Sequence, residues 1–412
     1  MQTKSEKILI ELAKAHLLTP WCYPSPFRDQ GSQKGKVRSK QHCDLLIVFG
    51  RDVIIFSDKQ VHFRKHATLE LSWGRWYRDA VLESAGQLDG AKRWVESHPG
   101  RVFEDELCEV PIPIPADANI HLIATCRGAA KSCQAFFGGG TGSLMFHAGN
   151  LTNPELAPFQ VGCISERGNV VHVLDSEVID VVLRHLDTLP EFLRYLQQRA
   201  ILARSGTAVM SAGEEELLVL FLGRLNPDGL HGFEGLLEFG AVATQEGLLA
   251  QYTASQAYAS KKQADKNSYV WDTLIEHLFE AMRPIDDTPL PFPLRSSLAW
   301  LAREPRVRRR MLGESVLTAI RSATKPGRFA RALHPSRPGD PLWVFMALQR
   351  PPDLDFAAYV QVRQEMLWSY VLAARYLHKE PVEVVGIGLN AWGDKPASED
   401  LLWLPNDDWT EE

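Results

Sequence analysis

The sequence predicts an α/β fold, and three observations near its N-terminus predict it. Residues 5–18 place apolar side chains at helical spacing, and a proline-rich segment then ends the helix. Residues 43–49 and 53–57 are aliphatic, β-branched and aromatic runs separated by Gly50-Arg51-Asp52, which is typical of a strand hairpin. Residues 73–97 again repeat apolar side chains at helical spacing. With a further strand expected within 102–114, these elements form an N-terminal α/β layer.

The length of 412 residues leaves room for two or three domains. We expect the α/β layer to span 1–115 and a mixed α/β extension to span 116–250, where the strands either complete the first sheet or build a second layer. Residues 251–412 read as helices followed by a β-α-β unit with two parallel strands, at 343–348 and 382–389, around a helix at 355–377. We expect this last region to regulate the protein or bind a partner.

Charge is informative only locally. The 45 basic and 51 acidic residues give a net charge of −6, which excludes a basic nucleic-acid coat protein. Two windows are strongly basic, 28–40 and 303–331, and each is either a solvated face or a surface that contacts phosphate. We expect the first window to be a mobile loop. Its candidate nucleic-acid-binding residues are Arg28, Lys34, Lys36, Arg38 and Lys40.

The expected hairpin carries charged residues that a simple core does not explain. Asp44 begins a strand whose next residues are all apolar, and burying an unpaired carboxylate there would cost several kcal/mol. Because side chains alternate along a strand, Ile55, Ser57 and Lys59 share one face. A carboxylate and a lysine that meet across the hairpin suit a metal-bound carboxylate beside a cation that steadies a hydroxide or phosphate. A plain cross-strand ion pair is the alternative.

This order of elements resembles the PD-(D/E)XK nuclease superfamily over residues 5–115. The pattern consists of a helix with Glu11, a strand with Asp44, a strand ending in Phe56-Ser57-Asp58-Lys59, and a helix with Gln87. The resemblance implies a restriction-endonuclease-like αβββαβ layer in which Asp44 and Asp58 hold Mg²⁺ or Mn²⁺. It further implies that the lysine positions the attacking water. The candidate catalytic residues are Asp44, Asp58, Lys59, Gln87, Ser57 and Glu11.

The motif departs from the family pattern at one position. Ser57 stands where the pattern has an acid, and Asp58 should face the other side of an ideal strand. Either a β-bulge turns Asp58 inward, or the site has one acid fewer, or it is inactive. Glu11 and Gln87 also read as ordinary solvated positions on their helices.

Two classes of function follow. The first is a Mg²⁺-dependent endonuclease acting on DNA, controlled by its C-terminal region or a partner, and the whole arrangement also resembles bacterial anti-phage defence proteins. The second is an inactive nuclease-like scaffold that binds nucleic acid or protein. Besides nucleic acid, we expect a partner protein or a second copy of the chain as binding partner. The sequence has no run of eighteen apolar residues and no Cys-x-x-Cys pair, so we expect a cytoplasmic protein without membrane contact.

Overall fold

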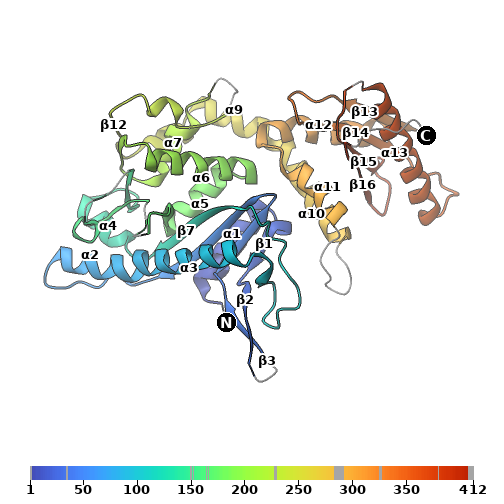
Figure 1. The fold of residues 1–412 in the computed structure, drawn as a ribbon. Coiled ribbons are helices and arrows are strands. Elements are labelled where there is room, and N and C mark those ends of the chain that lie inside the picture. Colours follow the sequence, from blue (N-terminus) through green and yellow to red (C-terminus); the bar gives the residue numbers. More distant parts are fainter. Residues whose placement is uncertain are drawn as a thin grey trace. The chain divides into compact units, whose positions relative to one another are not determined.

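The protein has two compact units, Met1–Ser260 and Lys261–Glu412. Its structure is a computed structural model that describes residues 2–33, 36–148, 151, 153–163, 165, 167–226, 230–282, 292–323, 327–378 and 380–406. Figure 1 shows that helices and strands alternate in both units. The α/β class expected from the sequence is confirmed. The division between the units falls after Ser260, whereas the sequence pattern places its last boundary at 250.

A five-stranded sheet forms the centre of the first unit, and its strands follow one another in chain order as β1-β4-β5-β7-β10. β4 runs antiparallel to both of its neighbours, and the β5–β7 and β7–β10 pairs are parallel. The strands are β1 (Cys22–Pro24), β4 (Leu45–Phe49), β5 (Asp52–Gln60), β7 (Asn119–Arg127) and β10 (Val171–Asp175). The hairpin between β4 and β5 turns at Gly50, whose φ of 59° suits a residue without a Cβ atom.

Helices lie on both faces of this sheet. The first is α1 (Lys4–Leu17), which Thr3 caps in a reciprocal capping box with Glu6. On the other face, α2 (Leu69–Tyr77), a π-helical turn (Arg78–Leu82) and α3 (Glu83–Ser97) form one continuous helical segment. The buried side chains of this segment pack on Leu46, Val48 and Ile55 of the β4–β5 hairpin. The side chains of β5 that alternate with Ile55 therefore face away from α3.

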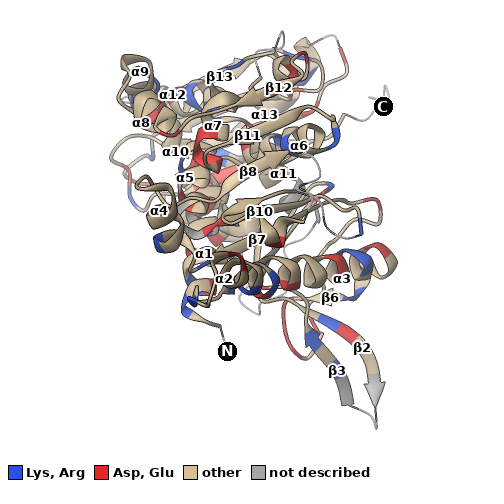
Figure 2. Ribbon diagram, turned by 90° about the vertical axis from the view of Figure 1, so that its left-hand side faces the viewer, with Lys and Arg blue, Asp and Glu red and all other residues tan. Residues whose placement is uncertain are grey.

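Residues 28–40 are not the loop that their charge suggests, because they form most of an antiparallel hairpin. Its strands are β2 (Phe27–Gln33) and β3 (Lys36–Gln41), and β2 also pairs with β6 (Val102–Phe103). Asp29 accepts hydrogen bonds from the Gly31 backbone N–H and from Arg101, which fixes the irregular register of β2. Figure 2 shows the hairpin extending away from the rest of its unit, with basic segments on its strands. Local charge could not predict this hairpin, because β2 pairs with β6, which lies far along the chain.

The rest of the first unit extends the sheet and adds a second layer. β7 and β10 complete the central sheet, while a second sheet has the order β12-β11-β8-β9. Its strands are β8 (Met145–Ala148), β9 (Gln160–Val161), β11 (Ala208–Ser211) and β12 (Ala241–Ala243). The helices are α4 (Ala130–Phe137), α5 (Ser176–His185), α6 (Leu189–Arg204), α7 (Glu214–Leu222), α8 (Leu248–Thr253) and α9 (Gln256–Asp265), of which α9 crosses the division between the units.

The second unit contains the expected β-α-β arrangement. β14 (Leu342–Leu348) and β15 (Val384–Asn390) are parallel and are joined through α13 (Phe356–Leu377). β13 (Arg328–Leu333) and β16 (Glu399–Leu404) complete the sheet as antiparallel edges. α10 (Tyr269–Met282), α11 (Phe292–Ala302) and α12 (Arg306–Ser322) precede it. A Cβ atom at Gly386 would lie 2.6 Å from Val371 Cγ2, so glycine permits the close approach of α13 to β15.

Candidate functional site

Regular strand pairing places Asp44, Ser57 and Lys59 on the same face of the central sheet. The register pairs Leu45 with Phe56, so Asp44, just before it, lies opposite Ser57. Lys59 follows Ser57 by two residues along β5, and alternation puts both side chains on the face that α3 covers. Asp44 and Lys59, the carboxylate and the lysine of the expected motif, therefore lie on one face of the sheet.

Two hydrogen-bond donors near the end of the β4–β5 hairpin hold the Asp44 carboxylate. Its Oδ2 accepts a hydrogen bond from the Asp58 backbone N–H at 2.7 Å, and its Oδ1 accepts one from Gln41 Nε2 at 3.1 Å. Burial, with a smaller contribution from the charge of Glu6, nevertheless raises the pKa of Asp44 to about 6. A carboxylate that is costly to ionise gains from any cation that reaches it.

Gln87 on α3 completes this group. Ser57 Oγ donates a hydrogen bond to Gln87 Oε1 at 3.3 Å, which links the strand to the helix. Gly86 and Gly90 flank Gln87, and a Cβ atom at either position would meet nothing within 4 Å. These small residues leave space in front of Gln87, so the helix lines a cavity at this point.

Asp58 does not join Asp44, which corrects the expectation that both carboxylates hold one metal ion. The pairing of β5 with β7 runs without a bulge from Asp52 to Gln60, so nothing turns Asp58 toward the α3 face. Its Oδ1 instead accepts hydrogen bonds from Thr125 Oγ1 at 2.6 Å and Arg127 Nε at 3.1 Å. The Asp58 side chain is fully buried in this pair. The side chains of β5 alternate regularly through Asp58, and the β-bulge considered from the sequence is not present in this strand.

Glu11 also lies away from the group. It is an exposed residue of α1 and is not among the residues that line the cavity at Asp44. Glu6, one and a half turns earlier in the helix, lines that cavity instead. The sequence carried a signal for Glu6, because Thr3 and Glu6 have the spacing of a capping box. That signal marks the start of the helix and says nothing about a site.

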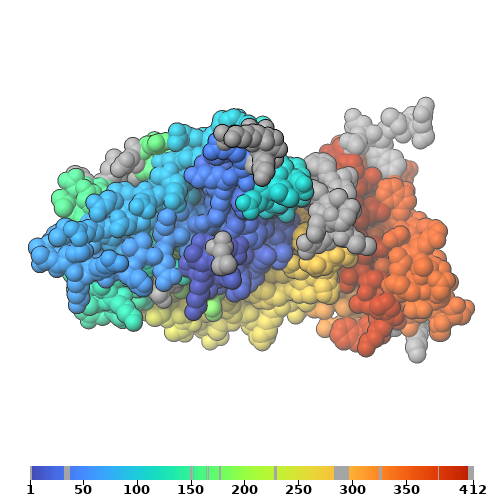
Figure 3. All heavy atoms as spheres, turned by 90° about the horizontal axis from the view of Figure 1, so that it is seen from below, coloured from blue at the N-terminus to red at the C-terminus, as the bar shows by residue number. Residues whose placement is uncertain are grey.

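A cavity of about 450 Å³ unites these side chains. The expected motif contributes Asp44, Ser57, Asp58, Lys59 and Gln87 to its lining. The other charged and polar lining residues are Glu6 of α1, Arg28 and Lys40 of the β2–β3 hairpin, and His42 just after that hairpin, and Gly86 and Gly90 line it from α3. In Figure 3 the blue part of the chain, which contains α1, the hairpin and α3, gathers on the face in view. The cavity thus joins the motif residues to part of the basic window.

His42 is a cavity residue that reasoning from the sequence missed. Its side chain is buried, and neither ring nitrogen has a hydrogen-bond partner among the described residues. Burial, with a smaller contribution from the nearby charge of Arg28, lowers its pKa to about 4, so the imidazole is neutral at pH 7. His42 and Asp44 are two residues apart just before β4, a spacing that would place them on one face of a strand and so could have marked them as neighbours.

The residues of the basic window divide into three groups. Arg28 and Lys40 line the cavity, and the Arg28 guanidinium lies 5.1 Å from the ring centroid of Trp94. Arg38 is exposed on β3. Lys34 lies outside the described residues, and the side chain of Lys36 lies outside them as well.

The donor set at Asp44 is compatible with a weakly held divalent cation. Within the described ranges, no group of three or more His, Cys, Asp and Glu side chains is placed to hold a metal ion. One carboxylate with neutral oxygens such as Ser57 Oγ is the kind of set that binds Mg²⁺ together with water and substrate phosphate. Asp44, Ser57 and Gln87 are the residues that would hold it.

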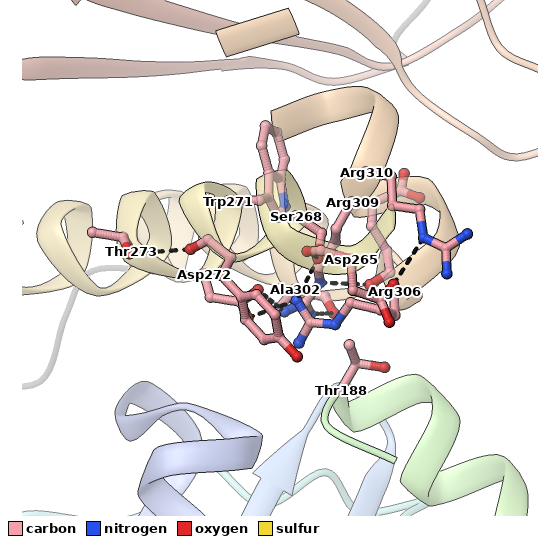
Figure 4. A network of polar contacts seen from close by, with 12 residues as sticks. Thr188, Asp265, Ser268, Trp271, Asp272, Thr273, Ala302, Arg306, Arg309 and Arg310 are labelled. Atoms are coloured by element: carbon pink, nitrogen blue, oxygen red, sulfur yellow. Dashed lines mark hydrogen bonds and ion pairs between the residues drawn. The ribbon is translucent and has the colours of Figure 1, made fainter. Parts of the chain in front are cut away.

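Four arginines of the second basic window, Arg306, Arg308, Arg309 and Arg310, serve the internal packing of their own unit. Figure 4 shows Arg306, Arg309 and Arg310 directed at Asp265 and Asp272. Arg309 is fully buried and also donates to the backbone carbonyls of Ala302 and Glu304. Arg308 pairs with Glu304 and Asp340. These arginines are engaged in ion pairs, so the phosphate contact considered for this window has no free guanidinium to use among them.

No family model, curated protein or solved structure matches this chain. Among the helices of the described segments, none combines the length and apolar character needed to cross a membrane.

Proposed function

We propose that this protein is a metal-dependent nuclease that cleaves phosphodiester bonds within DNA. The observation that carries the proposal is that one cavity is lined by Asp44, Ser57, Lys59 and Gln87 and also by Arg28 and Lys40 of the β2–β3 hairpin. The central-sheet strands and main helices, taken in the order α1, β1, β4, β5, α3 and β7 without β2, β3, α2 and β6, also support the αβββαβ layer that the resemblance implies.

Each residue then has a chemical role that its position allows. Asp44 holds the divalent cation, which when bound supplies charge stabilisation to the phosphate and activates water. Lys59 has no ion-pair partner in the described part of the chain, and it neutralises charge that develops on the phosphate oxygens. Gln87, which is tied to Ser57, orients the water or the phosphate. Arg28 and Lys40 hold the phosphate backbone next to the reacting bond.

The second unit has a regulatory or partner-binding role in this proposal, since its basic run is used in its own ion pairs. Together with the resemblance to anti-phage proteins, this arrangement favours a defence effector.

A non-cleaving nucleic-acid-binding protein is the second candidate. The specific observation in its favour is the burial of the Asp58 carboxylate against Arg127, which leaves Asp44 as the one carboxylate of the motif available to a metal ion.

Cleavage by matched double variants decides between the two. Asp44→Ala with Lys59→Ala removes one acid and one base from the cavity, and we expect it to lose Mg²⁺- or Mn²⁺-dependent cleavage of plasmid DNA. The control is Arg51→Ala with Asp117→Ala, which removes an exposed ion pair of 2.8 Å that lines no part of the cavity. Full cleavage by the cavity variant contradicts the proposal. Metal-independent binding without cleavage by the wild type favours the second candidate.

A further inference from the structure

A second and larger cavity adjoins the first through Lys59. It has a volume of about 590 Å³, and Lys59 lines both cavities. The chain reaches it where β5 ends and continues toward α2, and the first turns of the long helical segment form its other wall. Its charged and titratable lining residues are Lys59, His62, Arg64, His66, Arg75, Asp79 and Glu83.

The cations of this second cavity are largely uncommitted. Among described residues, Lys59 and Arg64 make no ion pair or side-chain hydrogen bond, and Arg64 is exposed. Arg75 lies 3.4 Å from both ring nitrogens of His66 and pairs with no carboxylate in the part of the chain that the structure describes. Asp79 lies on the same helical segment as Arg75 and pairs with Arg78, which lines no part of the cavity. Arginines at a cavity wall that no internal carboxylate holds are available to an anion.

We propose that the second cavity binds the phosphodiester backbone of the same nucleic-acid strand on the far side of the bond held at Asp44. The proposal rests on the proposed function and adds a second contact site for its substrate. Each cavity contributes its own pair of cations, Arg28 with Lys40 in the first and Arg64 with Arg75 in the second. Lys59 lies between the two pairs, so a strand that follows the cations passes Asp44.

A polymer fits this arrangement better than a free phosphate ion. Asp79 and Glu83 offset part of the positive charge of the second cavity, which weakens binding of a single small anion there. A strand already held in the first cavity presents its next phosphates at a high effective concentration, so modest attraction is sufficient. Contacts on both sides of the reacting bond also mean that the site does not need a strand end, which predicts cleavage of circular DNA.

The salt dependence of binding tests the proposal separately from cleavage. We would measure binding of a fluorescein-labelled single-stranded oligodeoxynucleotide in EDTA to the full chain and to Arg64→Gln with Arg75→Gln. Losing two phosphate contacts should flatten the slope of log affinity against log salt by about 1.4, at about 0.7 per contact for single strands. Arg64→Lys with Arg75→Lys keeps both charges and should restore most of the slope.

The matched control is Arg51→Gln with Arg184→Gln, two exposed arginines of the same unit that line neither cavity. Arg51 precedes the start of β5, about 26 Å along the strand from Lys59 at about 3.3 Å per residue. Equal slopes for all variants, an equal loss in the control, or no binding by the wild type overturns the proposal. So does binding of inorganic phosphate that depends on Arg64 and Arg75 while the oligonucleotide slope is unchanged. Absence of metal-dependent cleavage by the wild type, together with the expected slope effect, would contradict only the proposed function.

Discussion

Replacing Asp44 by asparagine should stabilise the folded protein while it abolishes metal-dependent cleavage. Burial raises the pKa of the Asp44 carboxyl from 3.8 to about 6. A difference of about 2 pKa units corresponds to about 3 kcal/mol of folding free energy lost when the carboxyl is ionised. Asparagine carries no charge and can still accept the hydrogen bond from the Asp58 backbone N–H. Allowing about 1 kcal/mol for a poorer hydrogen-bond network, the net gain at pH 8 is about 2 kcal/mol.

The sign of the pH dependence follows from the raised pKa. Between about pH 4 and pH 6 the folded state binds a proton at Asp44 that the unfolded chain has lost, so the stability of the wild type falls as the pH rises through this range. The variant has no such group. It should therefore be about 1 kcal/mol less stable than the wild type at pH 4, where only the poorer hydrogen-bond network counts, and about 2 kcal/mol more stable at pH 8.

Urea unfolding followed by circular dichroism at the two pH values measures this difference. Hydrogen–deuterium exchange of peptides from β4 and β5 localises the gain to the hairpin. Asp117→Asn is the control, because its exposed carboxylate should change stability by less than about 0.5 kcal/mol. Added MgCl₂ should stabilise the wild type at pH 8 and leave the Asp44→Asn variant unaffected. A variant that is less stable than the wild type at pH 8, or equally displaced at both pH values, would refute the reasoning.

Three further outcomes follow from the same structure. The cleavage rate should rise about tenfold per pH unit and level off near pH 6, where Asp44 becomes ionised to hold the cation; a rate independent of pH between 5 and 7 would contradict this role. Asp58→Asn should cost about 2–4 kcal/mol in urea unfolding, because it leaves Arg127 without its buried partner, whereas Mg²⁺ affinity measured by calorimetry should stay unchanged. Arg309→Leu should cost about 3–5 kcal/mol, and Arg310→Ser only about 1 kcal/mol, since Arg310 is partly exposed; equal losses would show that burial does not separate the two arginines.

Local patterns were sufficient to predict the elements that carry the site. Apolar runs around Gly50 predicted the β4–β5 hairpin, and alternation along β5 predicted that Ser57 and Lys59 share a face. Helical spacing predicted the segment that contains Gln87. These features depend on neighbours within a few residues, so the sequence alone could define them.

Features that depend on distant parts of the chain were missed. Phe27 pairs with Phe103 across a large sequence separation, so the basic window folded as strands where local charge suggested a loop. The partner of Asp58 is Arg127, on a strand that the motif does not include. Whether Glu6 or Glu11 lines the cavity depends on how α1 is rotated about its axis against the sheet, and tertiary packing determines that rotation.

The charge balance of the first cavity predicts that metal ion and nucleic acid bind cooperatively. Arg28, Lys40 and Lys59 oppose the carboxylates of Glu6 and Asp44, because the Asp58 carboxylate is neutralised by Arg127 on the other face. This positive excess disfavours a divalent cation in the free protein and favours the phosphate backbone. A bound phosphate reverses the balance and adds oxygen ligands, and linkage requires the metal to strengthen nucleic-acid binding by the same factor. Calorimetric titration of the Lys59→Ala variant with Ca²⁺, with and without an oligonucleotide, should show a smaller coupling than in the wild type, whereas identical coupling would show that the cavity charges do not control metal binding.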